Sequence, residues 1–353
     1  MQSTITKNSP IRVLVIDDSS LAQKVLTKEL SKDTRIQVVG TASDAFEASD
    51  IIPKLRPDVL TLDVNMPRLG GVEFLQQLMP QYPIPTIMVS SFTQRNGQIT
   101  LDALSAGAVD FVTKPKGNDP EEFKQRMNEL RSKICVASKA QVGKRITLKP
   151  SSASNLNTTK SEKKNTANKL IAIGASTGGT TAITTVLKAI PAASPAIAIV
   201  QHMPANFTTM FAERLNNQCQ IEVKEAANGD RLTASRALVA PGGKHMEVCK
   251  DSRGYWVKVS AGPPVSGHCP SVDVMMNSVA KVAGRQAVGA MLTGMGSDGA
   301  EGMLAMRKAG ARCIAQDEKT SVVFGMPREA YRRGGAEKLV PIDKIASGLW
   351  SLL

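Results

Sequence analysis

The first third of the chain alternates short apolar runs with stretches of helical spacing. Residues 11–16 (IRVLVI) are largely apolar and β-branched, and residues 21–30 (LAQKVLTKEL) then repeat apolar side chains at the helical period. Four more strand-then-helix pairs follow, at 35–40 and 44–55, 58–63 and 70–79, 85–90 and 97–107, and 109–114 and 121–133. Because these strands suit burial on both faces, the five units predict a doubly wound parallel sheet.

Polar side chains gather where these strands end. Asp17 and Asp18 follow the first strand, Asp63 ends the third, Ser90 the fourth and Lys114 the fifth. The carboxyl ends of parallel strands form the functional crevice of an open sheet. A single aspartate there is most simply a helix cap, but three converging carboxylates repel one another and favour a hard cation such as Mg²⁺. The pattern predicts a carboxylate that accepts a phosphoryl group, with Lys114 neutralising charge on the acceptor.

The segments VLVIDDSSLAQKVL, DVLTLDVNMPRLGG, MVSS and FVTKP together resemble the response-regulator receiver domain, over residues 10–130. The resemblance implies a flavodoxin-like fold in which a histidine kinase phosphorylates Asp63. It also implies roles for neighbouring residues: Mg²⁺ held by Asp18, Asp63 and the main-chain carbonyl of Asn65, assistance from Asp17, phosphate sensing by Ser90 and Lys114, and an aromatic rotamer switch at Phe111.

A second series of apolar runs begins at Lys169. Residues 170–174 (LIAIG) read as a strand, residues 180–190 as a helix, and the turn between them carries Ser176 in GASTG. This segment fits the G-x-S-x-G template of a nucleophile elbow in its strand–turn–helix context. It lacks the G-x-G-x-x-G spacing and the Gly-Lys-Ser/Thr of nucleotide-binding loops. For an isolated serine at a helix start, capping remains the more common role.

Two more strand ends supply possible partners for Ser176. The chain has three histidines, and His202 follows the buried-type run AIAIV, whereas His245 and His268 lie in loop-rich contexts and are weaker candidates for a base. Asp298 follows a third strand in a glycine-rich turn, where it could also cap the next helix. Together Ser176, His202 and Asp298 supply nucleophile, base and orienting acid. Their order differs from that of the known triad folds, so the triad would be convergent.

Residues 169–350 contain the motifs IGASTGG, VQHMP, FAERLN, LVAPGGKHMEV, HCPSVDVMMNSVA, MLTGMGSDGAEGM and AQDEKTSVVFGMPREA. Through these motifs the second half is similar to the catalytic domain of the CheB methylesterase family. The resemblance implies a Rossmann-like parallel-sheet domain that hydrolyses glutamyl methyl esters on methyl-accepting chemotaxis receptors, releasing methanol, and often deamidates glutamines. It assigns Ser176, His202 and Asp298 to the triad and places Thr177 and Met295 around the oxyanion and triad. It further implies a CheA-type kinase as phosphodonor, no cofactor for the esterase, and an unphosphorylated receiver covering the active-site face.

Composition and the two resemblances together predict the domain organisation. The 353 residues, 42% hydrophobic, allow two α/β domains, and we expect a receiver at 10–130, a basic flexible linker at 131–168 and a catalytic domain at 169–353. Between residues 139 and 164 the chain carries seven lysines and arginines against one glutamate, in a polar stretch without apolar period. Much of the net charge of +13 is therefore expected to be solvated linker charge.

The remaining expectations concern location and partners. The N-terminus has no signal-peptide core, and five scattered cysteines without a CxxC pair fit neither a disulfide framework nor zinc, so we expect a reduced, cytoplasmic protein without membrane insertion. The absence of heptads favours a monomer. A DNA-binding output would suit the basic charge, but residues 169–353 show no such pattern, and no nucleic acid is expected. A receiver-controlled scaffold with a degenerate triad is the other alternative.

Overall fold

The computed structural model describes residues 9–91, 93–115, 119–143 and 168–353, and the chain divides into two compact units, residues 1–145 and 146–353. No helix within the described ranges is long and apolar enough to cross a membrane. All five cysteines are free thiols.

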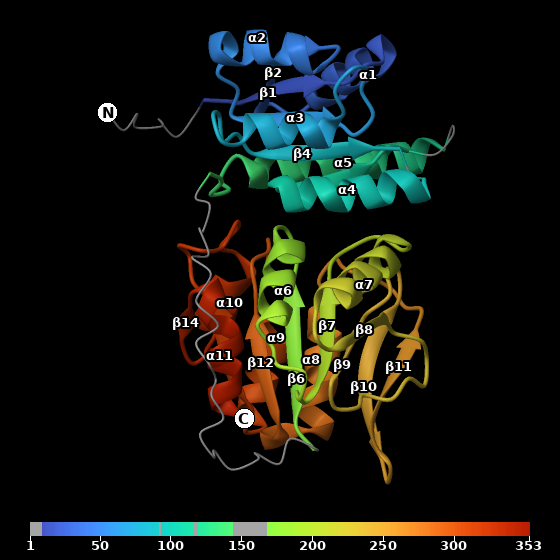
Figure 1. Ribbon diagram of the computed structural model, residues 1–353, viewed down its shortest axis with the longest axis vertical. Coiled ribbons are helices and arrows are strands. Elements are labelled where there is room, and N and C mark those ends of the chain that lie inside the picture. The colour runs from blue at the N-terminus through green and yellow to red at the C-terminus, as the bar shows by residue number, and fades with distance from the viewer. Residues whose placement is uncertain (1–8, 92, 116–118, 144–167) are drawn as a thin grey trace. The chain divides into compact units, whose positions relative to one another are not determined.

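The first unit is a five-stranded parallel sheet with the strand order β2-β1-β3-β4-β5. Its elements run from blue to green in Figure 1. Its strands are β1 (Ile11–Ile16), β2 (Ile36–Ala42), β3 (Val59–Asp63), β4 (Thr86–Ser90) and β5 (Asp110–Thr113). Its helices are α1 (Ser20–Leu30), α2 (Ala45–Leu55), α3 (Gly71–Leu78), α4 (Gln94–Ala106) and α5 (Pro120–Ala137). This is the flavodoxin-like order, so the predicted doubly wound fold is confirmed.

The end of the first unit differs from the predicted boundary at residue 130. Helix α5 continues to Ala137, because Met127, Leu130, Ile134 and Ala137 keep the apolar spacing of one buried helix face. Residues 131–137 are therefore helical, not linker. Most of the predicted linker, residues 144–167, lies outside the described residues.

The second unit is built on a seven-stranded sheet with the order β14-β13-β12-β6-β7-β9-β8, in which every pairing is parallel. Its strands are β6 (Leu170–Ala175), β7 (Ala196–Gln201), β8 (Glu222–Glu225), β9 (Arg236–Val239), β12 (Ala287–Met291), β13 (Arg312–Gln316) and β14 (Leu339–Val340). The helices are α6 (Gly179–Lys188), α7 (Phe207–Gln218), α8 (Val272–Val282), α9 (Ala300–Lys308), α10 (Met326–Arg332) and α11 (Ile342–Leu352), with the 3-10 turn η1 (Gly284–Gln286). The predicted Rossmann-like parallel sheet is confirmed. An antiparallel hairpin, β10 (His245–Asp251) and β11 (Gly254–Ser260), was not predicted.

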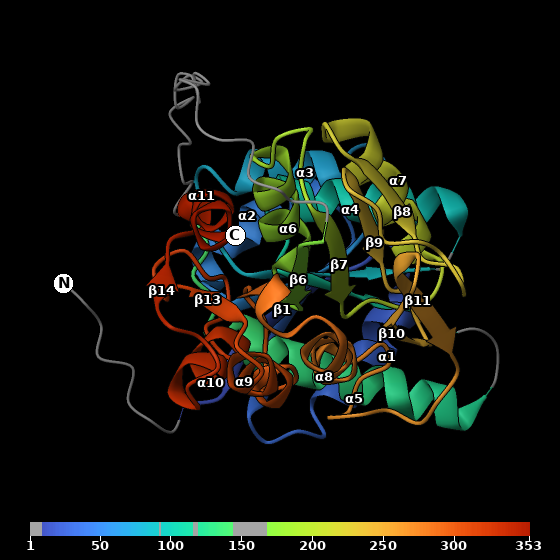
Figure 2. The ribbon, with the colours of Figure 1, turned by 90° about the horizontal axis from the view of Figure 1, so that it is seen from below.

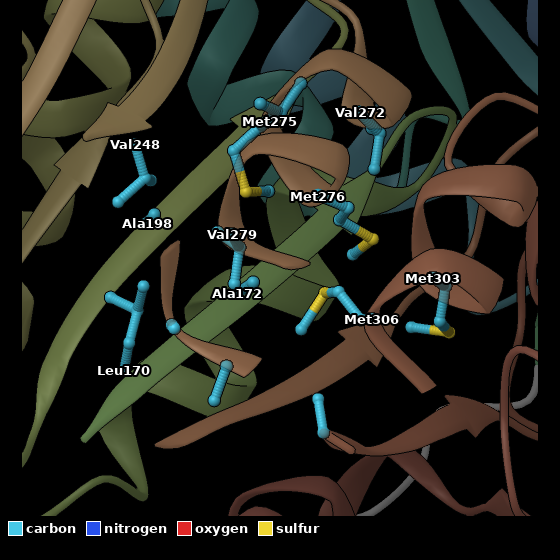
Figure 3. Packing of buried hydrophobic residues seen from close by; sticks show 14 of the residues in the cluster. Leu170, Ala172, Ala198, Val248, Val272, Met275, Met276, Val279, Met303 and Met306 are labelled. Atoms are coloured by element: carbon cyan, nitrogen blue, oxygen red, sulfur yellow. The ribbon is translucent and has the colours of Figure 1, made fainter. Parts of the chain in front are cut away.

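Helices cover both faces of this sheet. Figure 2 shows α8, α9 and α10 on one face and α6, α7 and α11 on the other. Between the sheet and the first group lies a methionine-rich core, in which Met275 and Met276 of α8 and Met303 and Met306 of α9 lie over the small side chains of β6 and β7 (Figure 3). These long, unbranched side chains fill the irregular space beneath two helices that pack closely together. The core thereby holds the start of α8 and the start of α9 near the carboxyl ends of β6 and β12.

Candidate active site and phosphoryl-acceptor site

Ser176 lies in the tight turn between β6 and α6. Its N–H donates to the Thr293 carbonyl over 3.0 Å, and its carbonyl accepts bonds from the Gly179 N–H and the Gln201 side-chain amide at 2.7 and 2.9 Å. A Cβ on Gly179 would lie 2.7 Å from Cβ of Ala175 and 2.1 Å from Oε1 of Gln201, so glycine suits this close turn. The backbone of Ser176 is thus fixed between the strand ends of β7 and β12.

His202 follows β7, the strand beside β6. Its N–H donates to the Ala175 carbonyl over 3.1 Å, which places it next to the residue before Ser176. Its side chain is only 7% exposed, and its Nε2 lies 2.7 Å from Oδ2 of Asp298. The buried Nδ1 has no hydrogen-bond partner among the described residues, so the Ser176 hydroxyl is not bonded to it. The second ring nitrogen is the one left for a proton from Ser176.

Asp298, in the loop after β12, is held by the first turn of another helix. Besides His202, its carboxylate accepts bonds from Oγ of Ser271 at 2.8 Å, the Val272 N–H at 2.7 Å and the Asp273 N–H at 3.1 Å. Burial opposes ionisation, but the bond and charge of His202 and the backbone N–H groups outweigh it and lower the pKa of Asp298 to about 2. An ionised Asp298 both orients His202 and satisfies the N–H groups at the start of α8.

Asp273 forms the reciprocal contact. It lies in the first turn of α8, and its Oδ1 accepts the Gly302 N–H of α9 at 2.7 Å, while its Oδ2 accepts the Ser266 hydroxyl at 3.1 Å. Burial and the neighbouring charge of Asp298 raise the pKa of Asp273, although the backbone bonds act in the opposite direction. Asp298, just before α9, thus caps α8, and Asp273, at the start of α8, caps α9.

Thr177 and Met295 lie on the two loops that meet at Ser176. Thr177 is buried, and its carbonyl accepts the Thr293 hydroxyl at 3.0 Å. Met295 is 44% exposed, in the loop that also carries Asp298. A Cβ on Gly294 would lie 2.8 Å from Cβ of Ser176, so the two loops are in close contact.

The first unit carries an acidic cluster at the carboxyl ends of β1 and β3. Asp17, Asp18 and Asp63 each offer an oxygen, and these atoms lie within 4.8 Å of one another. Lys114 Nζ bridges Asp17 and Asp63 at 2.7 and 2.9 Å. Burial raises the pKa of Asp63 despite the opposing charge and bond of Lys114. For Lys114, burial acts to lower the pKa, but the two carboxylates outweigh it and raise the pKa. Asp17 and Asp63 are buried and Asp18 is exposed, and this all-oxygen set of mutually repelling carboxylates fits a hard divalent cation.

The other predicted receiver residues lie at or near the ends of strands β3, β4 and β5. Ser90 is buried at the end of β4, and its hydroxyl donates to the Ser91 carbonyl at 3.2 Å. Phe111 in β5 is 3% exposed, with Lys133 Nζ 5.3 Å from the ring centroid. Asn65 is exposed in the loop after β3. The start of α3 approaches so closely that a Cβ on Gly71 would lie 2.3 Å from the Asp63 carbonyl.

Sequence reasoning missed the residues that support the triad. Ser271 and Asp273 belong to the motif HCPSVD, whose capping serine is a visible signal, but their contact with Asp298 joins segments more than twenty residues apart. The ring of His268, a weak candidate from sequence, stacks on the ring of His202 with centroids 3.7 Å apart. His245 does not reach Asp298; it bonds to Pro263 and Ser271 instead.

A phosphoryl-acceptor unit followed by a parallel-sheet unit with a serine, histidine and aspartate cluster defines the class: a response regulator with a hydrolase output. Two family models match the chain, the response regulator receiver domain over residues 13–128 and the CheB methylesterase over residues 171–349. The chain belongs to the CheB methylesterase family.

Curated relatives extend over nearly the full length. A protein-glutamate methylesterase/protein-glutamine glutaminase of Syntrophotalea carbinolica is 56% identical over 97% of this chain and 98% of that protein. The protein of the same name from Salmonella typhimurium is 49% identical over 96% of this chain and 95% of its own length. The solved CheB methylesterase catalytic domain of Thermotoga maritima is 31% identical, with a TM-score of 0.52 over 53% of this chain and 100% of that one.

Proposed function

We propose that this chain is a phosphorylation-regulated serine hydrolase that demethylates glutamyl methyl esters on methyl-accepting chemotaxis receptors and deamidates receptor glutamines, serving chemotactic adaptation. The observation that carries the proposal is the pairing of His202 with an ionised Asp298, beside a serine whose backbone is fixed at the adjacent strand end. Curated relatives with this name match almost the whole chain, which supports the substrate class.

In the proposed mechanism, Asp298 holds the proton of Nε2 and leaves Nδ1 of His202 as the base. Nδ1 takes the hydroxyl proton of Ser176 as Oγ attacks the ester carbonyl carbon. Asp298 then stabilises the imidazolium that forms. Because its low pKa keeps Asp298 ionised, the ring has a negative partner at every pH at which the enzyme would work.

Collapse of the tetrahedral intermediate expels methoxide, which leaves as methanol with the proton from Nδ1. In deacylation, His202 takes a proton from water as the water oxygen attacks the same carbonyl. The second tetrahedral intermediate then collapses, the bond from its carbon to Oγ breaks, and His202 returns the proton to Oγ of Ser176. A receptor glutamate and free Ser176 remain. With a glutamine substrate the same steps release ammonia.

We place Thr177 and Met295 around the developing oxyanion. The Ser176 N–H is committed to the Thr293 carbonyl, so the donors must come from other groups near the start of α6 and the Asp298 loop. Both residues lie on loops in contact with Ser176. The positive end of the α6 dipole acts in the same direction.

In the first unit, Asp63 is the proposed phosphoryl acceptor, with a CheA-type histidine kinase as donor. Asp18, Asp63 and the Asn65 carbonyl would hold Mg²⁺, assisted by Asp17. Bound there, the ion neutralises the carboxylates and the oxygens of the transferring group. Lys114 already bridges Asp17 and Asp63 and would pair with the new phosphoryl charge, which Ser90 would also sense. Phe111 would report the change by altering its rotamer.

The esterase reaction needs no cofactor in this scheme, and we place it in the cytoplasm with the enzyme as a monomer. The scaffold alternative, with a degenerate triad, is disfavoured by the intact His202–Asp298 pair.

The test is methanol release from a methylated receptor signalling fragment, with and without a small phosphodonor and Mg²⁺. We expect Ser176→Ala to lower the rate by at least about 10³-fold, since it removes the nucleophile. We expect the phosphodonor to raise the wild-type rate and to leave Asp63→Asn unchanged. Equal release by wild type and Ser176→Ala would refute the triad.

A further inference from the structure

The catalytic-base candidate is stacked against a second histidine. The rings of His202 and His268 lie face to face, with centroids 3.7 Å apart and planes inclined by 11°. His268 comes from the segment between β11 and α8, where residues 261–267 are all exposed. The His268 ring, which covers the buried His202 imidazole, therefore belongs to a segment that is itself mostly exposed.

That segment is nevertheless attached at both ends to His245, a buried residue at the start of β10. Nε2 of His245 lies 2.9 Å from the Pro263 carbonyl, and the Ser271 N–H donates to Nδ1 over 3.2 Å. A ring with its proton on Nε2 makes both bonds. The Gly243 N–H adds a bond to the Cys269 carbonyl at 3.1 Å. His245, which the proposed mechanism does not use, thereby fixes the span that carries His268.

Between these attachments the chain makes a tight hairpin turn. Val265 and His268 exchange two backbone hydrogen bonds of 3.0 Å each, and the two residues between them, Ser266 and Gly267, both have positive φ, at 53° and 81°. Positive φ at both central positions is the geometry of a type I′ turn. The Ser266 hydroxyl then donates to Asp273, whose N–H bonds to Asp298. His268 and Asp298 are therefore parts of one hydrogen-bonded frame.

We propose that His268 is a positioning residue that fixes the ring plane of His202; this inference rests on the proposed function. The bond from Nε2 to Asp298 sets where one edge of the ring lies, but rotation about the Cβ–Cγ bond of histidine has broad minima. A stacked ring on one face limits that rotation. Nδ1, which has no hydrogen-bond partner among the described residues, is thereby kept in the one orientation in which the proposed mechanism uses it as the base.

The position of the stack indicates why the attachments are needed. A mobile loop would let His268 leave, and the plane of the His202 ring would then be held only by its bond to Asp298. A misplacement of about 1 Å at a reacting group can lower a rate by roughly 10²-fold. The type I′ turn, the His245 bonds and the Ser266 bond each remove freedom from the segment that carries the stacking ring.

The test compares full-length variants for kcat and KM in methanol release from the methylated receptor fragment, at one fixed phosphodonor and Mg²⁺ concentration. His268→Ala removes the stack, His268→Phe restores a flat ring, and His268→Leu restores volume without one. Val265→Ala is the matched control in the same turn, because its backbone bonds to residue 268 remain. Fluorescence of Trp256 and Trp350, both in the second unit, verifies folding of each variant.

We expect His268→Ala and His268→Leu to lower kcat roughly 10- to 100-fold with KM within about twofold of wild type, and His268→Phe to recover most of the loss. A rise in KM at unchanged kcat would overturn the proposal, since it would make His268 a substrate contact. Equal activity of the Phe and Ala variants would also overturn it. Wild-type release that Ser176→Ala does not abolish would instead refute the proposed triad itself.

Discussion

Asp298 performs two tasks with one carboxylate. It holds His202 and it accepts three bonds from the first turn of α8, so a substitution there affects both chemistry and stability. Because the folded pKa of about 2 lies below the usual 3.8, the ionised group stabilises the folded state above about pH 4. That contribution is lost as the pH falls through about 2. The difference corresponds to a free energy on the order of 2 kcal/mol.

We therefore predict a pH-dependent cost of Asp298→Asn. At pH 6 the variant should lose on the order of 2 kcal/mol of unfolding free energy, and the loss should shrink between about pH 4 and pH 2 as the wild-type carboxyl becomes protonated. Urea unfolding followed by tryptophan fluorescence measures this in the second unit alone. Asp343→Asn, at an exposed carboxylate, is the matched control. A difference that stays constant down to pH 2.5 would contradict the assignment.

At the scale of the elements, α8 and α9 cap each other: Asp298, just before α9, bonds to the start of α8, and Asp273 of α8 bonds to the start of α9. This arrangement requires the two helices to lie in close contact. Gly302 of α9 has no room for a side chain: a Cβ would lie 2.8 Å from Cβ of Met276 and 3.0 Å from the Asp273 carbonyl. Gly348 of α11 differs, because its nearest neighbour is the flexible end of Ile314 at 3.0 Å. Both are helical glycines of one unit, so helix propensity acts equally on both.

We predict opposite outcomes for alanine at these two positions. Gly302→Ala should destabilise the second unit by about 1–3 kcal/mol, because overpacking against α8 exceeds the gain in helix propensity of about 1 kcal/mol. Gly348→Ala should be neutral or slightly stabilising. Urea midpoints from tryptophan fluorescence compare the two, and methanol release should fall only for Gly302→Ala, since Asp273 and Asp298 move with the helices. Equal midpoints would show that α9 can shift without cost.

The same elements show what sequence can predict. Apolar runs followed by polar residues predict that Ser176, His202 and Asp298 each follow a separate strand. The sheet order then shows that these strands, β6, β7 and β12, are neighbours. The helix that Asp298 caps was not predictable from sequence. Its position just before α9 suggests that it caps α9, but the N-cap of α9 is Gly299, and the Asp298 carboxylate accepts the Val272 N–H of α8 instead. Likewise the hairpin β10–β11 is held by contacts with α8, and the His202–His268 stack joins residues far apart in sequence. Such features depend on tertiary packing, not on local pattern.

At the scale of the whole molecule, the chain joins two units that each have their own core and their own polar site. A phosphoryl group at Asp63 would affect the hydrolase by changing an equilibrium between a less active and a more active state, and the simplest such pair differs in access to Ser176. Asp17 and Asp63, which share Lys114, would form a local switch with Asp18, because the proposed phosphorylation of Asp63 would change the charge there. The expected output is a change in access, since no residue of the first unit belongs to the triad.

Deletion of residues 1–168 separates inhibition from activation. If the unphosphorylated receiver limits access, the shortened chain should release methanol faster than the unphosphorylated full-length chain and should ignore the phosphodonor. Asp63→Asn in the full chain is the matched control, with a low basal rate and no response, because it keeps the first unit but removes the acceptor. A shortened chain no faster than the unphosphorylated full-length chain would refute inhibition. If the full chain then still responded to the phosphodonor through Asp63, the receiver would be an activator. An activator must add an interaction that stabilises the active state, because uncovering a site cannot make the full chain faster than the shortened one.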